Sequence, residues 1–407
     1  MRPHFLTYLP LFIFLLSGLA SSTVLHTSSR WILDSNNNRV KLRCVNWAGA
    51  AETRIPEGLQ WQPVATIASW IANAGFNCVR LTYSIDMALD PNESVSSAFS
   101  SAASSTGTGT TLTNLYTTAV GKNPWLSSTT TRGVFAEVIQ ALGNVGVMVI
   151  LDNHVSHASW CCSTTDGNGW WASASGYNAA NSQYFDTNNW LSGLSAMATF
   201  AESYSNVIGM SLRNELRAVG TQDENNHADW YNYIQQGASA IHSANPNLLV
   251  VVGGVSYAID LSFLYSNPIN KSALGLSDKM VWEFHSYQWS NSDYTNCATW
   301  DSLIGSQVGY LLVQNEAYTG PLWLSEFGWA QVSTSTAEQQ YRNCLVKYME
   351  SNDADWSVWA MQGSYYVRSG TVNYDETYGL LNTQWSGWRN SSWISSIGSM
   401  WTVNQTP

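Results

Sequence analysis

Two glutamates in this sequence each end a short apolar run, where an ionised carboxylate is costly unless a partner or a reaction uses it. Glu326 closes the run PLWLSE, which has the length of a buried strand, and Glu215 closes GMSLRNE. Two carboxyl groups in different surroundings can divide acid and base work. That division suits acetal cleavage, in which one carboxyl group protonates the leaving oxygen and the other attacks the anomeric carbon.

Further polar and aromatic side chains fall at the ends of other strand-like runs. They are Arg80, His154, Asn214, His285, Tyr287 and Trp359. We expect Arg80, His285 and Tyr287 to hold Glu326 ionised, and Asn214 to bind a sugar hydroxyl. Glu283 is the nearest competing carboxylate. Strand alternation places it deeper on the same side as His285, which favours a structural role.

The elements that must position these residues are strand-like runs separated by helical or irregular crossovers. The runs are VKLRCVNW, NCVRLTYS, VMVILDNH, VIGMSLRNE, LLVVVGG, MVWEFHSY, PLWLSEFGW and DWSVWAMQ. Such alternation predicts parallel pairing, and eight units predict a single (β/α)8 TIM barrel. An open doubly wound sheet is the alternative, but VNWAGAAE after the first run is no dinucleotide fingerprint. The carboxyl ends of barrel strands share one rim, so the polar side chains should converge there.

Three segments lie outside this regular alternation. TSSRWILDSNNNRVKL predicts an N-terminal β-hairpin that turns at residues 36–38, beneath the barrel. The Ser/Thr/Ala/Gly-rich residues 92–131 predict a long βα-loop insertion, and HASWCCSTTDGNGWW predicts another. Trp170, Trp171 and Trp289 fall in loops above the rim, where they either pack within the loops or stack on sugar rings.

With these residues in order, the chain resembles glycoside hydrolase family 5, the cellulase family of retaining β-glycosidases. The resemblance covers essentially the whole chain after residue 22. It implies that Glu215 is the acid/base, that Glu326 is the nucleophile and that Trp359 floors the subsite beside the scissile bond. It also implies no cofactor. One departure is Leu216, where the family usually has proline after Asn-Glu.

The N-terminus predicts export. Residues 1–22, MRPHFLTYLPLFIFLLSGLASS, have the charged, apolar and small-residue regions of a secretory signal peptide, which leaves 23–407 as the catalytic domain. No second apolar run is long enough to span a membrane. We therefore expect a secreted glycoprotein of the extracellular or cell wall space, with sequons at Asn92, Asn270, Asn390 and Asn404.

The composition limits the partners. A net charge of −11 opposes binding to nucleic acid or to an anionic membrane surface. Charged residues make up only 11%, against 21 Trp and 20 Tyr, which suits a neutral, hydroxyl-rich ligand such as a polysaccharide or oligosaccharide. We expect a monomer.

Six cysteines favour disulfides in an oxidising compartment. They are Cys44, Cys78, Cys161, Cys162, Cys297 and Cys344. Cys297–Cys344 is the preferred bridge, whereas Cys161 and Cys162 are either a vicinal pair or free or paired elsewhere. No CxxC spacing indicates zinc, and the calcium-loop-like DGNG at Asp166 lacks the acidic twelfth residue, which is Tyr177. No metal is therefore expected.

The sequence predicts a secreted retaining glycosidase that cleaves β-linked polysaccharide. Internal cleavage of β-1,4-glucan is implied by the family resemblance, while β-mannan, xyloglucan and small glucosides remain open. A catalytically silent sugar-binding barrel is the competing prediction of another class. An NAD-dependent enzyme is a third, disfavoured by the missing phosphate loop and by export.

Overall fold

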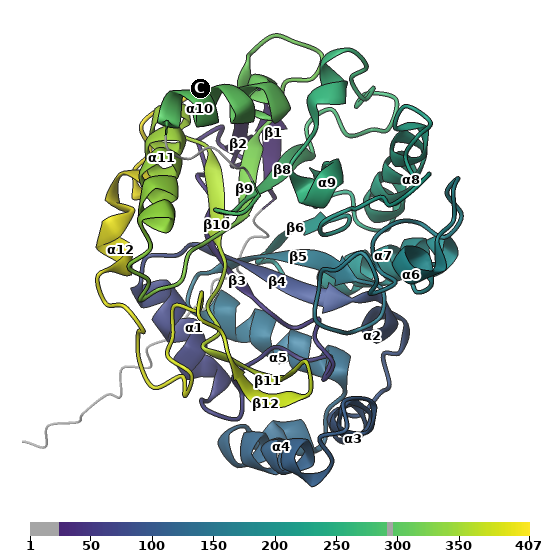
Figure 1. Cartoon of the computed structure of the whole chain (residues 1–407), viewed down its shortest axis with the longest axis vertical. Coiled ribbons are helices and arrows are strands. Elements are labelled where there is room, and N and C mark those ends of the chain that lie inside the picture. Colours follow the sequence, from purple (N-terminus) through teal and green to yellow (C-terminus); the bar gives the residue numbers. More distant parts are fainter. Residues whose placement is uncertain (1–23, 291–295) are drawn as a thin grey trace, which may run out of the picture.

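The computed structural model describes residues 24–290 and 296–407 and shows a closed barrel of eight parallel strands (Figure 1). Around the barrel the strands follow the order β10-β3-β4-β5-β6-β7-β8-β9, so every neighbour except the closing pair is the next barrel strand in sequence. The strands are β3 (Arg43–Trp47), β4 (Cys78–Ser84), β5 (Met148–Val155), β6 (Val207–Ser211), β7 (Leu249–Gly253), β8 (Met280–Ser286), β9 (Leu322–Phe327) and β10 (Asp355–Val358). The predicted (β/α)8 barrel is confirmed, and the open doubly wound sheet is excluded.

Helices cover the outside of the barrel (Figure 1). The longer ones are α1 (Val64–Asn73), α5 (Thr131–Asn144), α7 (Thr187–Ala201), α8 (Ala228–Ala244), α10 (Cys297–Gln307) and α11 (Thr336–Asn352). In α5 the side chains of Val134, Val138 and Leu142 repeat every four residues and are buried on one face. Thr130 caps this helix by accepting a hydrogen bond from the amide of Gly133.

Short elements complete the crossovers and the C-terminus. They are α2 (Ile85–Leu89), η1 (Pro124–Ser127), α6 (Ala179–Ser182), α9 (Val255–Ala258), η2 (Ser262–Tyr265), η3 (Gly309–Leu312), α12 (Trp393–Ser396) and η4 (Gly398–Trp401). Across the two described ranges, no helix is both long and apolar enough to cross a membrane. The predicted signal peptide, residues 1–22, lies outside the described residues.

The N-terminal hairpin packs against one end of the barrel, as predicted. The predicted turn at residues 36–38 is present, with Leu33 pairing with Arg39 across it, and an additional turn precedes it. Strand β1 (His26–Ser28) pairs with β2 (Trp31–Leu33), so the tight turn falls at residues 29–30. A second turn at residues 34–38 is fixed by the carboxylate of Asp34, which accepts amide hydrogens from Asn36 and Asn38. The prediction overlooked the first turn because it contains no Gly, Pro or Asn.

The predicted βα insertion at residues 92–131 is present between β4 and α5, but it is helical and not an irregular loop. It holds α3 (Val95–Ser105) and α4 (Thr110–Lys122). Buried Val95, Phe99 and Ala102 form an apolar stripe that the high Ser and Ala content obscured. Phe99 packs edge-on against Tyr366, with ring centroids 5.0 Å apart.

That tyrosine belongs to a hairpin that the sequence reading missed. Strands β11 (Ser364–Arg368) and β12 (Thr371–Asp375) follow the last barrel strand and pair antiparallel. Figure 1 shows this hairpin beside α4, with which β11 is in contact. The insertion therefore supports a hairpin whose residues reach the cleft described next.

Candidate active site

A cleft of about 670 Å³ opens at the C-terminal rim of the barrel. Seven of the eight predicted site residues line it: His154, Asn214, Glu215, His285, Tyr287, Glu326 and Trp359. The eighth, Arg80, is fully buried beneath them. The structure thus brings all eight predicted residues together.

Their positions along the strands are less uniform than the sequence suggested. Glu326 is the fifth of six residues in β9, and Trp359 directly follows β10. Arg80 is only the third of seven residues in β4, so it lies inside the barrel and not at the rim. Asn214 and Glu215 lie three and four residues beyond the end of β6. The prediction that every site residue sits at a strand end was wrong for these three.

Glu326 receives donors on both carboxylate oxygens. Arg80 Nη1 donates to Oε1 at 2.6 Å, and the Tyr287 hydroxyl donates to Oε2 at 3.0 Å. His285 Nδ1 lies 3.7 Å from Oε2. Charge-assisted bonds of this kind are among the strongest in proteins and fix the orientation of the carboxylate.

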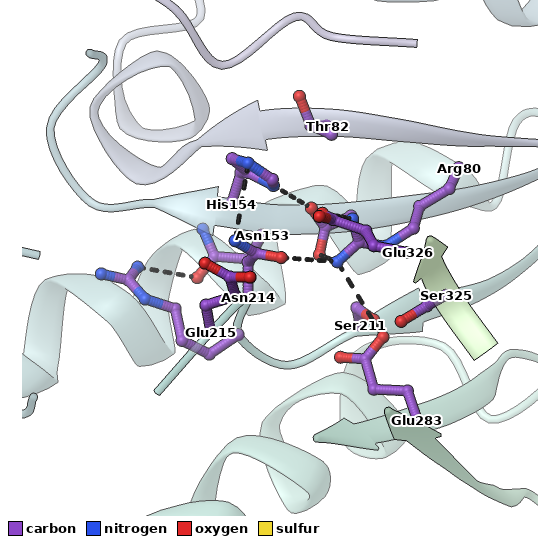
Figure 2. Close-up of polar contacts among 12 residues, drawn as sticks. Arg80, Thr82, Asn153, His154, Ser211, Asn214, Glu215, Glu283, Ser325 and Glu326 are labelled. Atoms are coloured by element: carbon purple, nitrogen blue, oxygen red, sulfur yellow. Dashed lines mark hydrogen bonds and ion pairs between the residues drawn. The ribbon is translucent and has the colours of Figure 1, made fainter. Parts of the chain in front are cut away.

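Arg80 links Glu326 to a buried polar network (Figure 2). Its Nη2 donates to Asp152 at 2.8 Å and to Asn214 Oδ1 at 2.9 Å, while Nη1 also donates to Asn46 at 3.0 Å. Burial alone would raise the pKa of Asp152, but Arg80 together with the hydrogen bond to His154 outweighs burial, and the net pKa is lowered. The buried network therefore contains an ionised Asp152 paired with a cationic Arg80.

Glu215 has a different environment from Glu326. Its side chain is 16% exposed, and burial raises its pKa although the nearby Arg217 opposes the shift. Its backbone has φ of 42°, a left-handed conformation that costs a non-glycine residue about 1–3 kcal/mol. Arg217 donates to the Glu215 carbonyl at 2.8 Å and binds both oxygens of Asp166 at 2.6 Å. Arg217 thus connects the backbone of Glu215 to Asp166, and this contact keeps the carboxyl group of Glu215 in the cleft.

Two histidines contact the carboxyl groups. His285 Nδ1 lies 3.0 Å from Glu215 Oε1, and burial lowers the pKa of His285 to about 4, so the imidazole is neutral near pH 7. A neutral imidazole nitrogen can donate or accept, which lets it partner Glu215 in either protonation state. His154 Nδ1 lies 2.7 Å from Asp152, and its ring stacks on Trp359 at 5.7 Å.

Comparisons with known proteins agree with this geometry. Residues 33–364 match the family model described as cellulase (glycosyl hydrolase family 5). A "Glycosyl hydrolase 5 family protein" of Chamaecyparis obtusa is 38% identical over 98% of this chain and 69% of its own length. The chain belongs to glycosyl hydrolase family 5. It is a glycosidase that hydrolyses O-glycosyl bonds.

Endoglucanases of lower sequence identity are also similar to this chain. An endoglucanase of Paenibacillus polymyxa is 24% identical over 89% of this chain and 83% of its own length. The catalytic domain of the major endoglucanase from Xanthomonas campestris pv. campestris superposes with a TM-score of 0.71 at 20% identity, covering 93% of this chain and 99% of that domain. An endocellulase of Pyrococcus horikoshii, solved as a complex with cellotetraose, gives 0.71 at 17% identity, covering 94% of this chain and all of that one.

Within this family 5 site, sequence reasoning missed several residues. Asn46 and Asp152 both bind Arg80, and Asp152 carried a signal: it stands two residues before His154, so strand alternation turns both side chains the same way. Tyr374 and Tyr378, from and just after the β11–β12 hairpin, line the cleft but carried no such signal. Their positions depend on a hairpin that no motif indicated.

The three loop tryptophans differ in how far they are exposed. Trp170 and Trp171 are fully buried in the core, which excludes them from sugar stacking. Trp289 is 63% exposed, lines the cleft and stacks on Tyr287 with ring centroids 4.6 Å apart. Only Trp289 among these three is available to a ligand.

The cysteines form three disulfides. Cys297–Cys344 is confirmed, although Cys297 begins α10 and does not lie in a loop. Cys161 and Cys162 form the vicinal pair, and Cys44–Cys78 joins neighbouring strands β3 and β4. Asp166, considered for calcium, instead binds Arg217.

One cluster in the cleft has ligand-type atoms at metal-binding distances. Polar atoms of Glu215, His285 and Glu326 lie within 4.8 Å of one another. However, Arg80 and Tyr287 already donate to Glu326, and the Arg80 cation repels another cation at this point. The donor set therefore fits acid/base chemistry better than metal binding.

Proposed function

We propose that this family 5 hydrolase cleaves internal β-1,4 bonds of β-glucan by double displacement, with Glu326 as nucleophile and Glu215 as acid/base. The spacing of the two carboxyl groups carries the proposal. Carboxylate oxygens of Glu215 and Glu326 approach within 4.8 Å. Retaining glycosidases hold their carboxyl groups about 5–5.5 Å apart, whereas inverting enzymes separate them by about 6.5–9.5 Å to admit a water.

The unequal environments assign the two roles. Burial raises the pKa of Glu215, which favours the protonated form needed to donate to the leaving oxygen. Arg80 and Tyr287 aim donors at Glu326, as an ionised nucleophile requires. Glu326 attacks the anomeric carbon and forms a glycosyl ester as Glu215 protonates the departing oxygen. Glu215, now ionised, takes a proton from water, which hydrolyses the ester with net retention.

A neutral glucan substrate is supported by the cleft lining. Trp289, Trp359 and Tyr378 present aromatic surfaces to the cleft. Asn214 Nδ2 faces the same space, where it can donate to a sugar hydroxyl beside the reacting carbon. The names of the relatives, endoglucanase and endocellulase, point to the same substrate class.

Export is part of the proposal. The charged and apolar pattern of residues 1–22 and the three disulfides fit a protein that is secreted and acts outside the cell. One relative is a "Major extracellular endoglucanase" of Xanthomonas campestris. Mass spectrometry of the secreted protein should find an N-terminus near residue 23.

The first experiment assays reducing-end release from carboxymethyl cellulose, mixed-linkage glucan, xyloglucan and mannan. We expect cleavage of β-1,4-glucan, its loss in Glu326→Gln, and β-anomeric product at early times by NMR. On 2,4-dinitrophenyl β-cellobioside, whose leaving group needs no proton, Glu215→Ala should be rescued by azide with formation of a β-glycosyl azide, because the small anion needs no general base. Preferred cleavage of mannan would change the substrate, an α-anomeric first product would contradict retention, and binding without cleavage would indicate a sugar-binding barrel.

A further inference from the structure

The vicinal disulfide lies on the cleft wall, directly against the proposed acid/base. Cys161 and Cys162 both line the cleft, unlike the cysteines of the other two disulfides. The two sulfur atoms and a carboxylate oxygen of Glu215 all lie within 4.8 Å of one another. Asn214 Nδ2 lies 3.4 Å from Cys162 Sγ and 3.7 Å from Cys161 Sγ.

The surrounding structure fixes the disulfide from two sides. Behind it, Ala50 and Val155 form a small apolar cluster with the two cysteines. On the C-terminal side, the carbonyl of Ser163 accepts a hydrogen bond from Arg217 Nε at 2.8 Å. Arg217 also donates to the carbonyl of Glu215, so the same arginine holds the backbone of the disulfide loop and the backbone of the acid/base.

The chemistry of a disulfide suits a water-excluding surface. A disulfide has no hydrogen to donate and accepts only weakly, so it solvates a neighbouring carboxylate poorly. A carboxyl group beside such a surface favours its neutral form. The same sulfurs face Nδ2 of Asn214, while Oδ1 of this amide accepts from Arg80 at 2.9 Å. Both ends of the Asn214 amide are therefore held.

We propose that the Cys161–Cys162 disulfide is a positioning element of the acid/base half of the site. It keeps water from the Glu215 carboxyl group, which favours the protonated form of that group. This inference rests on the proposed role of Glu215.

The test replaces the disulfide by Cys161→Ser/Cys162→Ser, which adds two hydrated hydroxyl groups. Because Glu215 must be protonated to donate, better hydration should move the alkaline limb of the kcat/KM profile to lower pH, by roughly half a unit to one unit. Cleavage of cellotetraose on the alkaline limb should fall about 3- to 10-fold, in proportion to the lost protonated fraction. Hydrolysis of 2,4-dinitrophenyl β-cellobioside should stay within about 2-fold, since this leaving group needs no proton.

Cys161→Ala/Cys162→Ala keeps an apolar surface and should give a smaller limb shift than the serine pair. Cys297→Ala/Cys344→Ala, remote from the cleft, is the matched control, which should lower Tm without moving the limb. If a variant does not fold, mild phosphine reduction of the folded wild-type enzyme, with thiols assigned by mass spectrometry, should produce the same limb shift.

An unmoved alkaline limb, or equal losses on cellotetraose and the dinitrophenyl substrate, would overturn the positioning role. Failure of the proposed function is distinguishable, because Glu215→Ala would then leave the alkaline limb in place and show no azide rescue. If Glu215→Ala behaves as expected while the serine pair matches the wild type, only the role of the disulfide is rejected.

Discussion

Arg80 Nη1 lies 2.6 Å from Oε1 of Glu326, and neither side chain is more than 6% exposed. The other guanidinium nitrogen, Nη2, binds Asp152 and Asn214. One planar fork thus connects the proposed nucleophile with the residue that precedes the proposed acid/base. Arg80 therefore helps to fix the relative position of the two halves of the site, together with His285, which lies against both carboxyl groups.

Arg80→Lys should lower kcat about 10- to 100-fold, because a lysine keeps the charge but cannot serve Glu326 and Asp152 with one fork. Losing one hydrogen bond to a charged group corresponds to about 1.5–3 kcal/mol. Steady-state kinetics on cellotetraose would measure the fall in kcat, and thermal unfolding would measure the loss of stability. Arg213→Lys is the control: Arg213 is also buried but binds Asn153, Ser156 and Asn168. Equal kcat losses in both variants would contradict a specific role for Arg80.

Tyr287→Phe removes the hydroxyl that donates to Glu326 Oε2 at 3.0 Å but keeps the ring that stacks on Trp289. We expect kcat/KM to fall about 10- to 100-fold with little change in Tm. Tyr341→Phe is a matched control, because the Tyr341 hydroxyl donates to the backbone carbonyl of Ser286. A Tyr287→Phe variant with wild-type kinetics would show that Glu326 does not need the hydroxyl of Tyr287 as a donor.

Glu283→Gln should flatten the pH dependence of stability. Burial raises the pKa of Glu283 to about 7, although Arg80, 3.9 Å away, opposes the shift. The ordinary value of 4.5 applies after unfolding, so the neutral form stabilises the fold below pH 4.5. That stability is lost as pH rises from 4.5 through about 7.

The free energy of unfolding of Glu283→Gln, relative to that of the wild type, should therefore rise by up to about 3 kcal/mol between pH 4.5 and pH 7, because glutamine stays neutral. Thermal unfolding at a series of pH values would measure the difference. Glu350→Gln, an exposed glutamate on α11, should give a curve parallel to the wild type. If the stability of Glu283→Gln also follows the wild-type pH dependence, Glu283 is ionised in the folded protein between pH 4.5 and pH 7.

Trp289→Ala should weaken substrate binding and leave the fold intact. Its ring is 63% exposed in the cleft, so its removal leaves no core cavity. Loss of about 1 kcal/mol of stacking should raise KM for cellotetraose about 5-fold, with kcat and Tm nearly unchanged. Tyr265→Ala removes a similarly exposed ring that does not line the cleft and should leave KM unaltered. A fall in kcat without a change in KM would place Trp289 in the chemical step instead.

Much of the fold could be predicted because its signals are local. The eight apolar runs and their helical spacers give the barrel, and Glu215 and Glu326 end two of those runs. The buried Glu283 followed from strand alternation alone. These inferences need only the spacing of apolar residues along the sequence and the fact that the ends of parallel strands converge on one rim.

The network around Arg80 needed the tertiary structure. Arg80 and Glu326 are 246 residues apart, and no local pattern pairs them or adds Asn46. The helices of residues 92–131 were hidden because Ser and Thr compete with helix formation until buried contacts such as Phe99–Tyr366 favour the helix. The sequence alone thus determined the fold, and it also named the residues that we propose to carry the chemistry. Only the tertiary structure decided which donors face each carboxylate and that Cys44 pairs with Cys78, because those contacts join strands and loops that are distant along the chain.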